Sequence, residues 1–112
     1  MIINYKVGIM NLNNYETIYI LKPNITESEN LTLVNQYKSL IKKYGGQNIL
    51  IQHKGRRHLN YNIDSYYDGI YVQINYTASS NLVKILEKAM RLSEDIIRYI
   101  TIKNNHVGHI QI

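Results

Sequence analysis

A helix with both of its ends marked is predicted by residues 26–46, TESENLTLVNQYKSLIKKYGG. Thr26 and Glu29 have the T-x-x-E spacing of a capping box, in which a hydroxyl and a carboxylate bind the first free amides of a helix. Gly45–Gly46 then allows the left-handed stop that ends many helices. Between these signals, apolar residues recur at helical spacing and predict one buried stripe: Leu31, Val34, Tyr37, Leu40, Ile41 and Tyr44.

Strands are predicted on both sides of this helix. Tyr15–Leu21 is rich in β-branched and aromatic residues, and both of its faces are apolar, as in a central strand. Gln47–Ile63 predicts a long strand whose odd-numbered positions are mostly apolar and whose even-numbered positions are mostly polar. Gly55 interrupts this strand and predicts a bulge or a strong twist. Strict alternation would point Arg57 inward, so we expect the backbone to be distorted there.

The second half of the chain predicts a strand, a helix and a last strand. Asp64–Asp68 is expected to form a hairpin turn, and Gly69–Tyr76 the returning strand. One face of that strand is apolar: Ile70, Val72 and Ile74. Ser79 or Ser80 caps the second helix, and the last strand is Ile96–Lys103. The apolar stripe of the second helix is Leu82, Ile85, Leu86, Ala89 and Leu92.

The predicted order is strand–helix–strand–strand–helix–strand. Two interleaved right-handed β-α-β units of this kind form a four-stranded antiparallel sheet with both helices on one face. The sequence therefore predicts an α+β fold, the ferredoxin-like βαββαβ sandwich, over residues 15–103. Residues 1–14 are expected to be an N-terminal arm and residues 104–112 a C-terminal tail. The uncovered sheet face is the usual place for a ligand or a partner, although a fold alone does not set function.

Charge and composition restrict the classes of function. The chain has 112 residues, is 45% hydrophobic and contains no cysteine, which predicts a globular domain and excludes disulfides, thiol catalysis and cysteine–zinc sites. No apolar run approaches the ~20 residues that cross a membrane, and the first residues do not resemble a targeting peptide. The net charge is +5, and the segment from Asn30 to Ile63 has six basic residues and no acidic one. This asymmetry favours a polyanionic partner, although a solvated helix face with a charged turn would produce the same pattern.

Side chains for catalysis or metal binding are not expected to converge. His53 and His58 have opposite parity on one predicted strand and should face apart, and His106 and His109 lie in the predicted tail. No glycine loop suited to phosphate binding is found. Acylphosphatases share the predicted architecture, but their arginine loop is missing. The sequence therefore predicts no catalytic residue, no metal site, no cofactor and no small-molecule substrate.

The positions of the arginines indicate RNA binding, whereas the one tyrosine that could share this role does not. Arg56 and Arg57 are adjacent beside Gly55, and Arg98 lies in the last predicted strand. A guanidinium is preferred over an ammonium for bidentate phosphate contacts and for stacking on bases. Tyr71 alternates with the apolar positions of its strand, so it would reach the uncovered face, where RNA-recognition motifs stack bases. The opening of that motif is missing here, which favours a packing or partner-contact role for this tyrosine.

Four segments resemble, in order, the signatures of small-subunit ribosomal protein 6 of the bacterial and plastid type. They are YET (15–17), GRRHLNYNI (55–63), GIYV (69–72) and EDIIRYI (94–100). The resemblance covers about residues 15–103. Asn60 and Asn62 stand where the family usually has alanine and proline, and the N-terminal arm is longer than is usual for the family.

The resemblance implies a non-enzymatic protein of the small ribosomal subunit. The family binds the central domain of 16S-type ribosomal RNA together with small-subunit ribosomal protein 18. The implied RNA contacts are Arg56, Arg57 and Arg98, to which Lys54 and Lys103 are added from charge and position. The abundance of Ile, Asn, Tyr and Lys indicates AT-rich codons, which with the family implies a plastid ribosome, or else a bacterial cytoplasm. The alternative function is a self-associating regulatory or ligand-binding domain of the same fold.

Overall fold

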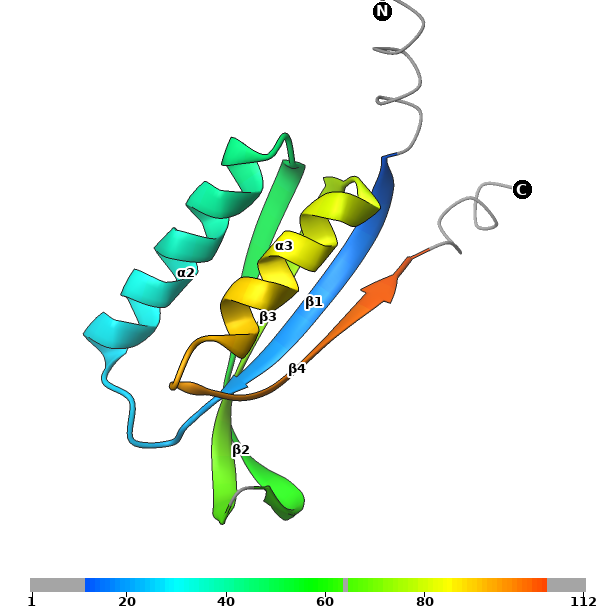
Figure 1. The fold of residues 1–112 in the computed structure, drawn as a ribbon. Helices are drawn as coiled ribbons and strands as arrows, with labels where there is room; N and C mark the ends of the chain where they lie inside the picture. Colours follow the sequence, from blue (N-terminus) through cyan, green and yellow to red (C-terminus); the bar gives the residue numbers. More distant parts are fainter. Residues whose placement is uncertain (1–11, 64, 105–112) are drawn as a thin grey trace, which may run out of the picture.

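The computed structural model describes residues 12–63 and 65–104, apart from the side chains of Tyr61 and Asn62. The elements are β1 (Asn13–Leu21), α2 (Glu27–Lys43), β2 (Gln47–Ile63), β3 (Tyr66–Ala78), α3 (Ser80–Arg91) and β4 (Ile96–Lys103). All neighbouring strands are antiparallel, in the order β2-β3-β1-β4. Both helices cover the same side of the sheet (Figure 1). The predicted ferredoxin-like sandwich is confirmed, and the uncovered side of the sheet is called the open face below.

Strand β1 begins two residues earlier than the sequence predicts. Asn13 and Asn14 pair with β3, so these two residues of the predicted arm belong to the sheet. At the other end of the chain, the backbone amide of Asn104 donates to the carbonyl of Asn14 over 2.8 Å. The rest of the predicted arm and tail, residues 1–11 and 105–112, lies outside the described residues, and so do the two histidines of the tail.

The turn between β2 and β3 is shorter than the predicted Asp64–Asp68. β3 already begins at Tyr66, because the aromatic residues there favour an extended strand. Ser65 has a φ of 71°, a left-handed value typical of tight turns. Asp68 therefore lies inside β3, where it pairs with His58. Asp64 itself is outside the described residues.

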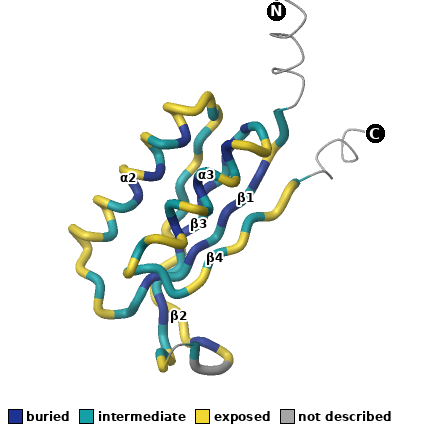
Figure 2. Tube along the Cα trace, viewed as in Figure 1, coloured by how far each residue is buried: buried dark blue, intermediate teal, exposed yellow. Residues whose placement is uncertain are grey.

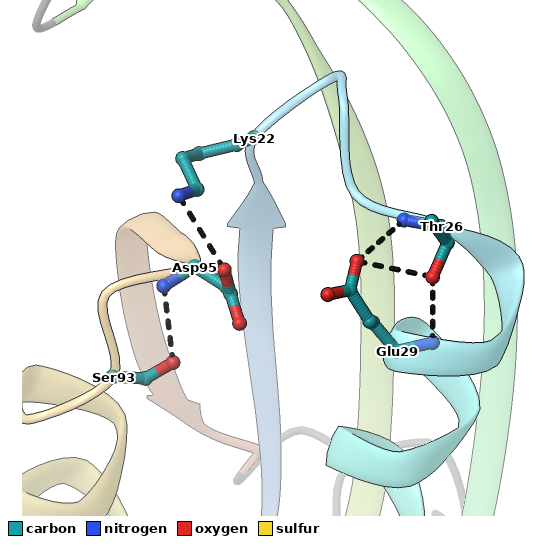
Figure 3. A network of polar contacts seen from close by, with 5 residues as sticks. All are labelled: Lys22, Thr26, Glu29, Ser93 and Asp95. Carbon is teal, nitrogen blue, oxygen red and sulfur yellow. Dashed lines mark hydrogen bonds and ion pairs between the residues drawn. The ribbon is translucent and has the colours of Figure 1, made fainter.

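The predicted helix caps are confirmed. Thr26 Oγ1 accepts a hydrogen bond from the amide of Glu29 (3.1 Å), and a carboxylate oxygen of Glu29 accepts one from the amide of Thr26 (2.9 Å; Figure 3). Gly45 follows α2 with a φ of 89°, as expected for the stop. Ser79 caps α3, and its Oγ accepts a hydrogen bond from the amide of Leu82.

The core lies between the helices and the sheet side that they cover (Figure 2). The odd-numbered residues of β1 from 15 to 21 are buried, which settles the face that the sequence left open. The even-numbered residues of β3 from 72 to 78 meet them in the same layer. From the helices, the buried side chains are Val34, Tyr37, Ile41, Leu82, Leu86 and Met90.

Three residues of the predicted apolar stripes are exposed to solvent. They are Leu31, Tyr44 and Leu92. Tyr44 and Leu92 are C-cap residues, so they lie beyond the helical turns that pack on the sheet. Met90, which is not part of the predicted stripe, is buried, because it follows Leu86 by four residues on the same helix face.

Candidate nucleic-acid interface

The predicted bulge in β2 is confirmed, and it determines which way the arginines point. His53 pairs with Val72 and Gly55 pairs with Tyr71, so Lys54 is one extra residue between two regular stretches of pairing. Gly55 has a φ of 86°, as in bulges that contain a left-handed glycine. Because of this extra residue, odd-numbered residues of β2 point to the helix-covered side before the bulge and to the open face after it. The apolar face that was expected to continue through Gly55 therefore changes sides there.

Arg57 lies on the open face as a result. It pairs with Gly69, and its guanidinium carbon lies 5.5 Å from the centre of the Tyr71 ring. The negative face of an aromatic ring attracts a cation in this position. Arg57 is exposed and Tyr71 is half-buried. The prediction that backbone distortion, rather than a buried charge, explains Arg57 is confirmed.

Arg56 points to the opposite side of the sheet. It pairs with Ile70, which lies on the helix-covered side of β3. Its Nη2 donates a hydrogen bond to the backbone carbonyl of Pro23 over 2.8 Å, which connects β2 to the loop between β1 and α2. The two adjacent arginines of the sequence therefore have different surroundings.

Arg98 shares the open face with Arg57. It pairs with Ile20 of β1, and Ile20 pairs on its other side with Tyr71 of β3. The strands of the two arginines are three strand spacings apart, about 14 Å. A shallow depression between them is lined by Ile18, Ile20, Tyr71, Arg98, Tyr99 and Ile100. The two arginines and the two side chains between them form a row that crosses the whole sheet. We define this arginine row as Arg98, Ile20, Tyr71 and Arg57.

The two candidate lysines lie apart from the arginine row. Lys54 is exposed at the bulge, and Lys103 is exposed at the end of β4, where it pairs with Tyr15. In the described part of the chain, the ion pairs are Lys22–Asp95 (3.4 Å) and His58–Asp68 (3.0 Å). None of the five basic candidates is neutralised by a carboxylate within that part.

Apolar side chains occupy the β1–β4 side of the open face. Ile100 is 55% exposed and Ile102 is 48% exposed. Ile100 pairs with Ile18 of β1, so the apolar surface continues onto β1 there, whereas Ile102 pairs with Glu16. The apolar patch, defined as Ile18, Ile20, Ile100 and Ile102, is of the kind that marks protein contacts.

The expectation that His53 and His58 face apart is wrong. Because of the bulge, both histidines pair with even-numbered residues of β3. They therefore point to the same side of the sheet. His58 Nδ1 lies 3.0 Å from a carboxylate oxygen of Asp68, a contact that the alternation of the sequence does not predict. Over residues 12–63 and 65–104, no three His, Asp or Glu side chains form a group that could hold a metal ion. No helix in these ranges is long and apolar enough to span a membrane.

Comparison with known proteins identifies the family. The family model described as Ribosomal protein S6 matches residues 14–103. The chain belongs to the ribosomal protein S6 family. Over 103 residues, it is 81% identical to small ribosomal subunit protein bS6c of Gracilaria tenuistipitata var. liui, covering 92% of this chain and 100% of that protein. It is 51% identical over 90 residues to bS6 of Synechococcus sp. (strain RCC307), covering 80% of this chain and 67% of that one.

A solved S6 structure has the same fold. The crystal structure of 30S ribosomal protein S6 from Thermotoga maritima matches with a TM-score of 0.83 and 26% identity, covering 89% of this chain and 94% of that one. The resemblance to bacterial and plastid S6 proteins is thereby confirmed. Similarity to bS6c proteins of red algae supports the predicted plastid ribosome, and the cyanobacterial bS6 proteins fit the bacterial alternative. The S6 family comprises ribosomal structural proteins and is not an enzyme family.

Proposed function

We propose that this S6-family protein binds the central domain of 16S-type ribosomal RNA in the plastid small subunit, together with small-subunit ribosomal protein 18. Its role there is structural and not catalytic. The observation that supports the proposal best is the arginine row, in which Arg57 and Arg98 lie exposed on one sheet face. No carboxylate pairs with either of them in the described part of the chain.

Arg57 and Arg98 are the proposed phosphate contacts of the open face. A guanidinium can hold a phosphate with two parallel hydrogen bonds, and neutralising phosphates releases bound counterions. Tyr71 supports this role, because its ring orients Arg57 while leaving the charge exposed. An arginine on an aromatic face is also a platform on which an unpaired base can stack.

Arg56, Lys54 and Lys103 are proposed as peripheral RNA contacts. Arg56 uses Nη2 to hold the Pro23 carbonyl, and a guanidinium has five N–H donors, so others stay available for phosphate. Lys54 and Lys103 are exposed point charges at the bulge and at the end of β4. We expect each of these three to contribute less than Arg57 or Arg98.

The apolar patch is the proposed contact with ribosomal protein 18. Its two most exposed members lie on β4, an edge strand of the described sheet. A protein partner that covers Ile100 and Ile102 would leave Arg57, on β2 at the opposite edge of the sheet, free for RNA.

The proposal is tested by sedimentation with small ribosomal subunits. Tagged full-length chain, expressed in plastids of its source, should remain with the small subunit after a high-salt wash. The purified chain should bind a central-domain RNA fragment, and ribosomal protein 18 should increase its affinity. A stable homodimer that neither sediments with subunits nor binds this fragment would contradict the proposal and favour a self-associating domain.

A further inference from the structure

A polar depression of about 220 Å³ lies on the open face, at the end remote from the arginine row. Its lining comes from β1, β3, the start of β2 and the residue after β4. The amide pocket, as we call it, is lined by Asn14, Tyr15, Glu16, Asn48, Asn75, Tyr76, Thr77 and Asn104. Four of these residues are asparagines, so the pocket combines neutral hydrogen-bond donors and acceptors with one carboxylate.

Hydrogen bonds between strands hold the polar groups of the pocket in place. Thr77 Oγ1 donates to Asn14 Oδ1 over 2.7 Å and accepts from Asn48 Nδ2 over 3.3 Å. Nearer the middle of the sheet, Gln73 Nε2 donates to Asn75 Oδ1 over 2.8 Å and to Glu16 Oε2 over 3.2 Å. Groups that are already ordered lose little freedom when a ligand binds, which favours affinity.

Among the residues that the structure describes, these contacts leave a defined set of polar groups unused. Asn14 and Asn75 each use the side-chain oxygen, so each keeps an Nδ2 donor. Glu16 keeps its second carboxylate oxygen as an acceptor. Asn104 Oδ1 is buried and has no hydrogen-bond partner among the residues that the structure describes. The pocket therefore offers both hydrogen-bond donors and hydrogen-bond acceptors to a ligand.

We infer that the amide pocket binds one unpaired nucleobase of ribosomal RNA by its edge, and that it prefers a base with an exocyclic amino group. The inference rests on the proposed function. Amide side chains match the adjacent donor and acceptor of such a base, and a carboxylate accepts from its amino group, as for cytosine N4. RNA proteins recognise unstacked bases in this way, by their Watson–Crick edges.

The charges around the pocket favour a base over a phosphate or an apolar protein segment. Glu16 repels a phosphate, whereas it attracts an amino group. Uracil would present a carbonyl oxygen to the carboxylate where cytosine presents an amino group. The apolar patch adjoins the pocket where Ile102 pairs with Glu16, but the pocket lining itself is mostly polar and suits an apolar protein segment poorly.

Two oligonucleotides of equal length and charge test the preference. The ¹⁵N-labelled full-length chain is titrated with single-stranded hexacytidylate and with hexauridylate, and the side-chain amide signals are followed by NMR. Hexacytidylate should shift the signals of Asn14 and Asn75 and should bind about tenfold more tightly than hexauridylate. The amide of Asn35, exposed on α2, serves as the internal control and should not shift. Equal affinities, or no shift at the pocket amides, would overturn the inference.

Glu16→Gln tests the role of the carboxylate. The variant should lose the preference for hexacytidylate, and its salt dependence should stay unchanged because no phosphate contact is removed. Glu27→Gln on α2 removes the same charge on the helix-covered side and should keep the preference. A gain in affinity for both oligonucleotides with Glu16→Gln would show that Glu16 only repels RNA, and would overturn the inference.

Failure of the base-pocket inference and failure of the proposed function can be told apart. A chain that sediments with small subunits but binds both oligonucleotides equally retains the proposed function and lacks the base pocket. A chain that fails to sediment contradicts the proposed function, whatever the oligonucleotides do. Shifts of the pocket amides caused by ribosomal protein 18 without RNA would assign the pocket to a protein contact, which also overturns the inference.

Discussion

Two buried tyrosines of the core differ in what their hydroxyl groups contact. The hydroxyl of Tyr76 is 2.7 Å from Thr17 Oγ1, which in turn is 2.8 Å from Thr101 Oγ1. The hydroxyl of Tyr19 is buried and has no hydrogen-bond partner in the described ranges, although its ring packs edge-on against Tyr37 at 5.5 Å. Burial raises the pKa of Tyr19 and of Tyr76 above the usual value of a phenol.

Phenylalanine substitutions at these two positions should have opposite effects on stability. Tyr19→Phe removes an unpaired buried polar group, so we expect the free energy of unfolding to rise by about 1 kcal/mol. Tyr76→Phe removes a hydrogen-bonded hydroxyl and should lower it by about 1 kcal/mol. Urea denaturation of both variants measures the difference. Two changes of the same sign would refute this assignment of the hydroxyl groups.

At the scale of one element, the capping box connects the stability of α2 to pH. The pKa of Glu29 is lowered by the hydrogen bond from the backbone amide of Thr26, and further by that from its hydroxyl. The unfolded chain loses these bonds, so the folded pKa lies below the unfolded one. The stabilisation by Glu29 is therefore present above the unfolded pKa and is lost as the pH falls through the folded pKa.

Glu29→Ala should lower stability in a pH-dependent way. We expect the gap in urea midpoint between the wild type and the variant to be largest near pH 7 and to shrink as the pH falls through the folded pKa, because protonation of the wild-type carboxyl weakens the capping box. Glu27→Ala, in the same helical turn, is the control, because no capping-box hydrogen bond involves Glu27. A gap for Glu29→Ala that does not change with pH would rule out the carboxylate as its cause.

The bulge in β2 connects backbone strain with the position of Arg57. Gly55→Ala places a side chain at a φ of 86°, which should cost about 1 kcal/mol of stability, and no other atom lies within 4 Å of the new methyl group. Because the strain is relieved by reshaping the bulge, affinity for the central-domain RNA fragment should fall as well. Gly45→Ala has the same strain at a φ of 89° but lies after α2, so it should reduce stability and leave RNA affinity unchanged. Equal RNA affinities of the two variants would disprove this role of the bulge.

The elements could be predicted from the sequence because their signals are local. Helix α2 has its cap, stripe and stop within residues 26–46, and Gly55 marks the bulge directly. The reversal of alternation beyond Gly55 could not be predicted, because it depends on which residues of β3 pair with β2. For that reason the sequence grouped Arg56 with Arg57, whereas the structure separates them across the sheet.

At the scale of the whole molecule, function depends on how four strands align. Arg57 and Arg98 share a face only through the pairing of Ile20 with both Tyr71 and Arg98. The amide pocket likewise combines residues from positions 14 to 104 of the chain. The sequence does have asparagines near the ends of its strands, but the high asparagine content of the chain is explained equally well by codon bias. The open face thus has an arginine row at one end, an amide pocket at the other and an apolar patch beside them.

The central claim is that Arg57 and Arg98 bind ribosomal RNA phosphates from one face of the sheet. It is tested most directly by the salt dependence of binding to the central-domain RNA fragment, with ribosomal protein 18 present. The double variant Arg57→Ala/Arg98→Ala should flatten the slope of log affinity against log salt by about 0.7–0.9 for each lost phosphate contact. Arg91→Ala, which removes an exposed arginine of α3, should leave the slope as it is. A double variant with the wild-type slope would contradict the claim.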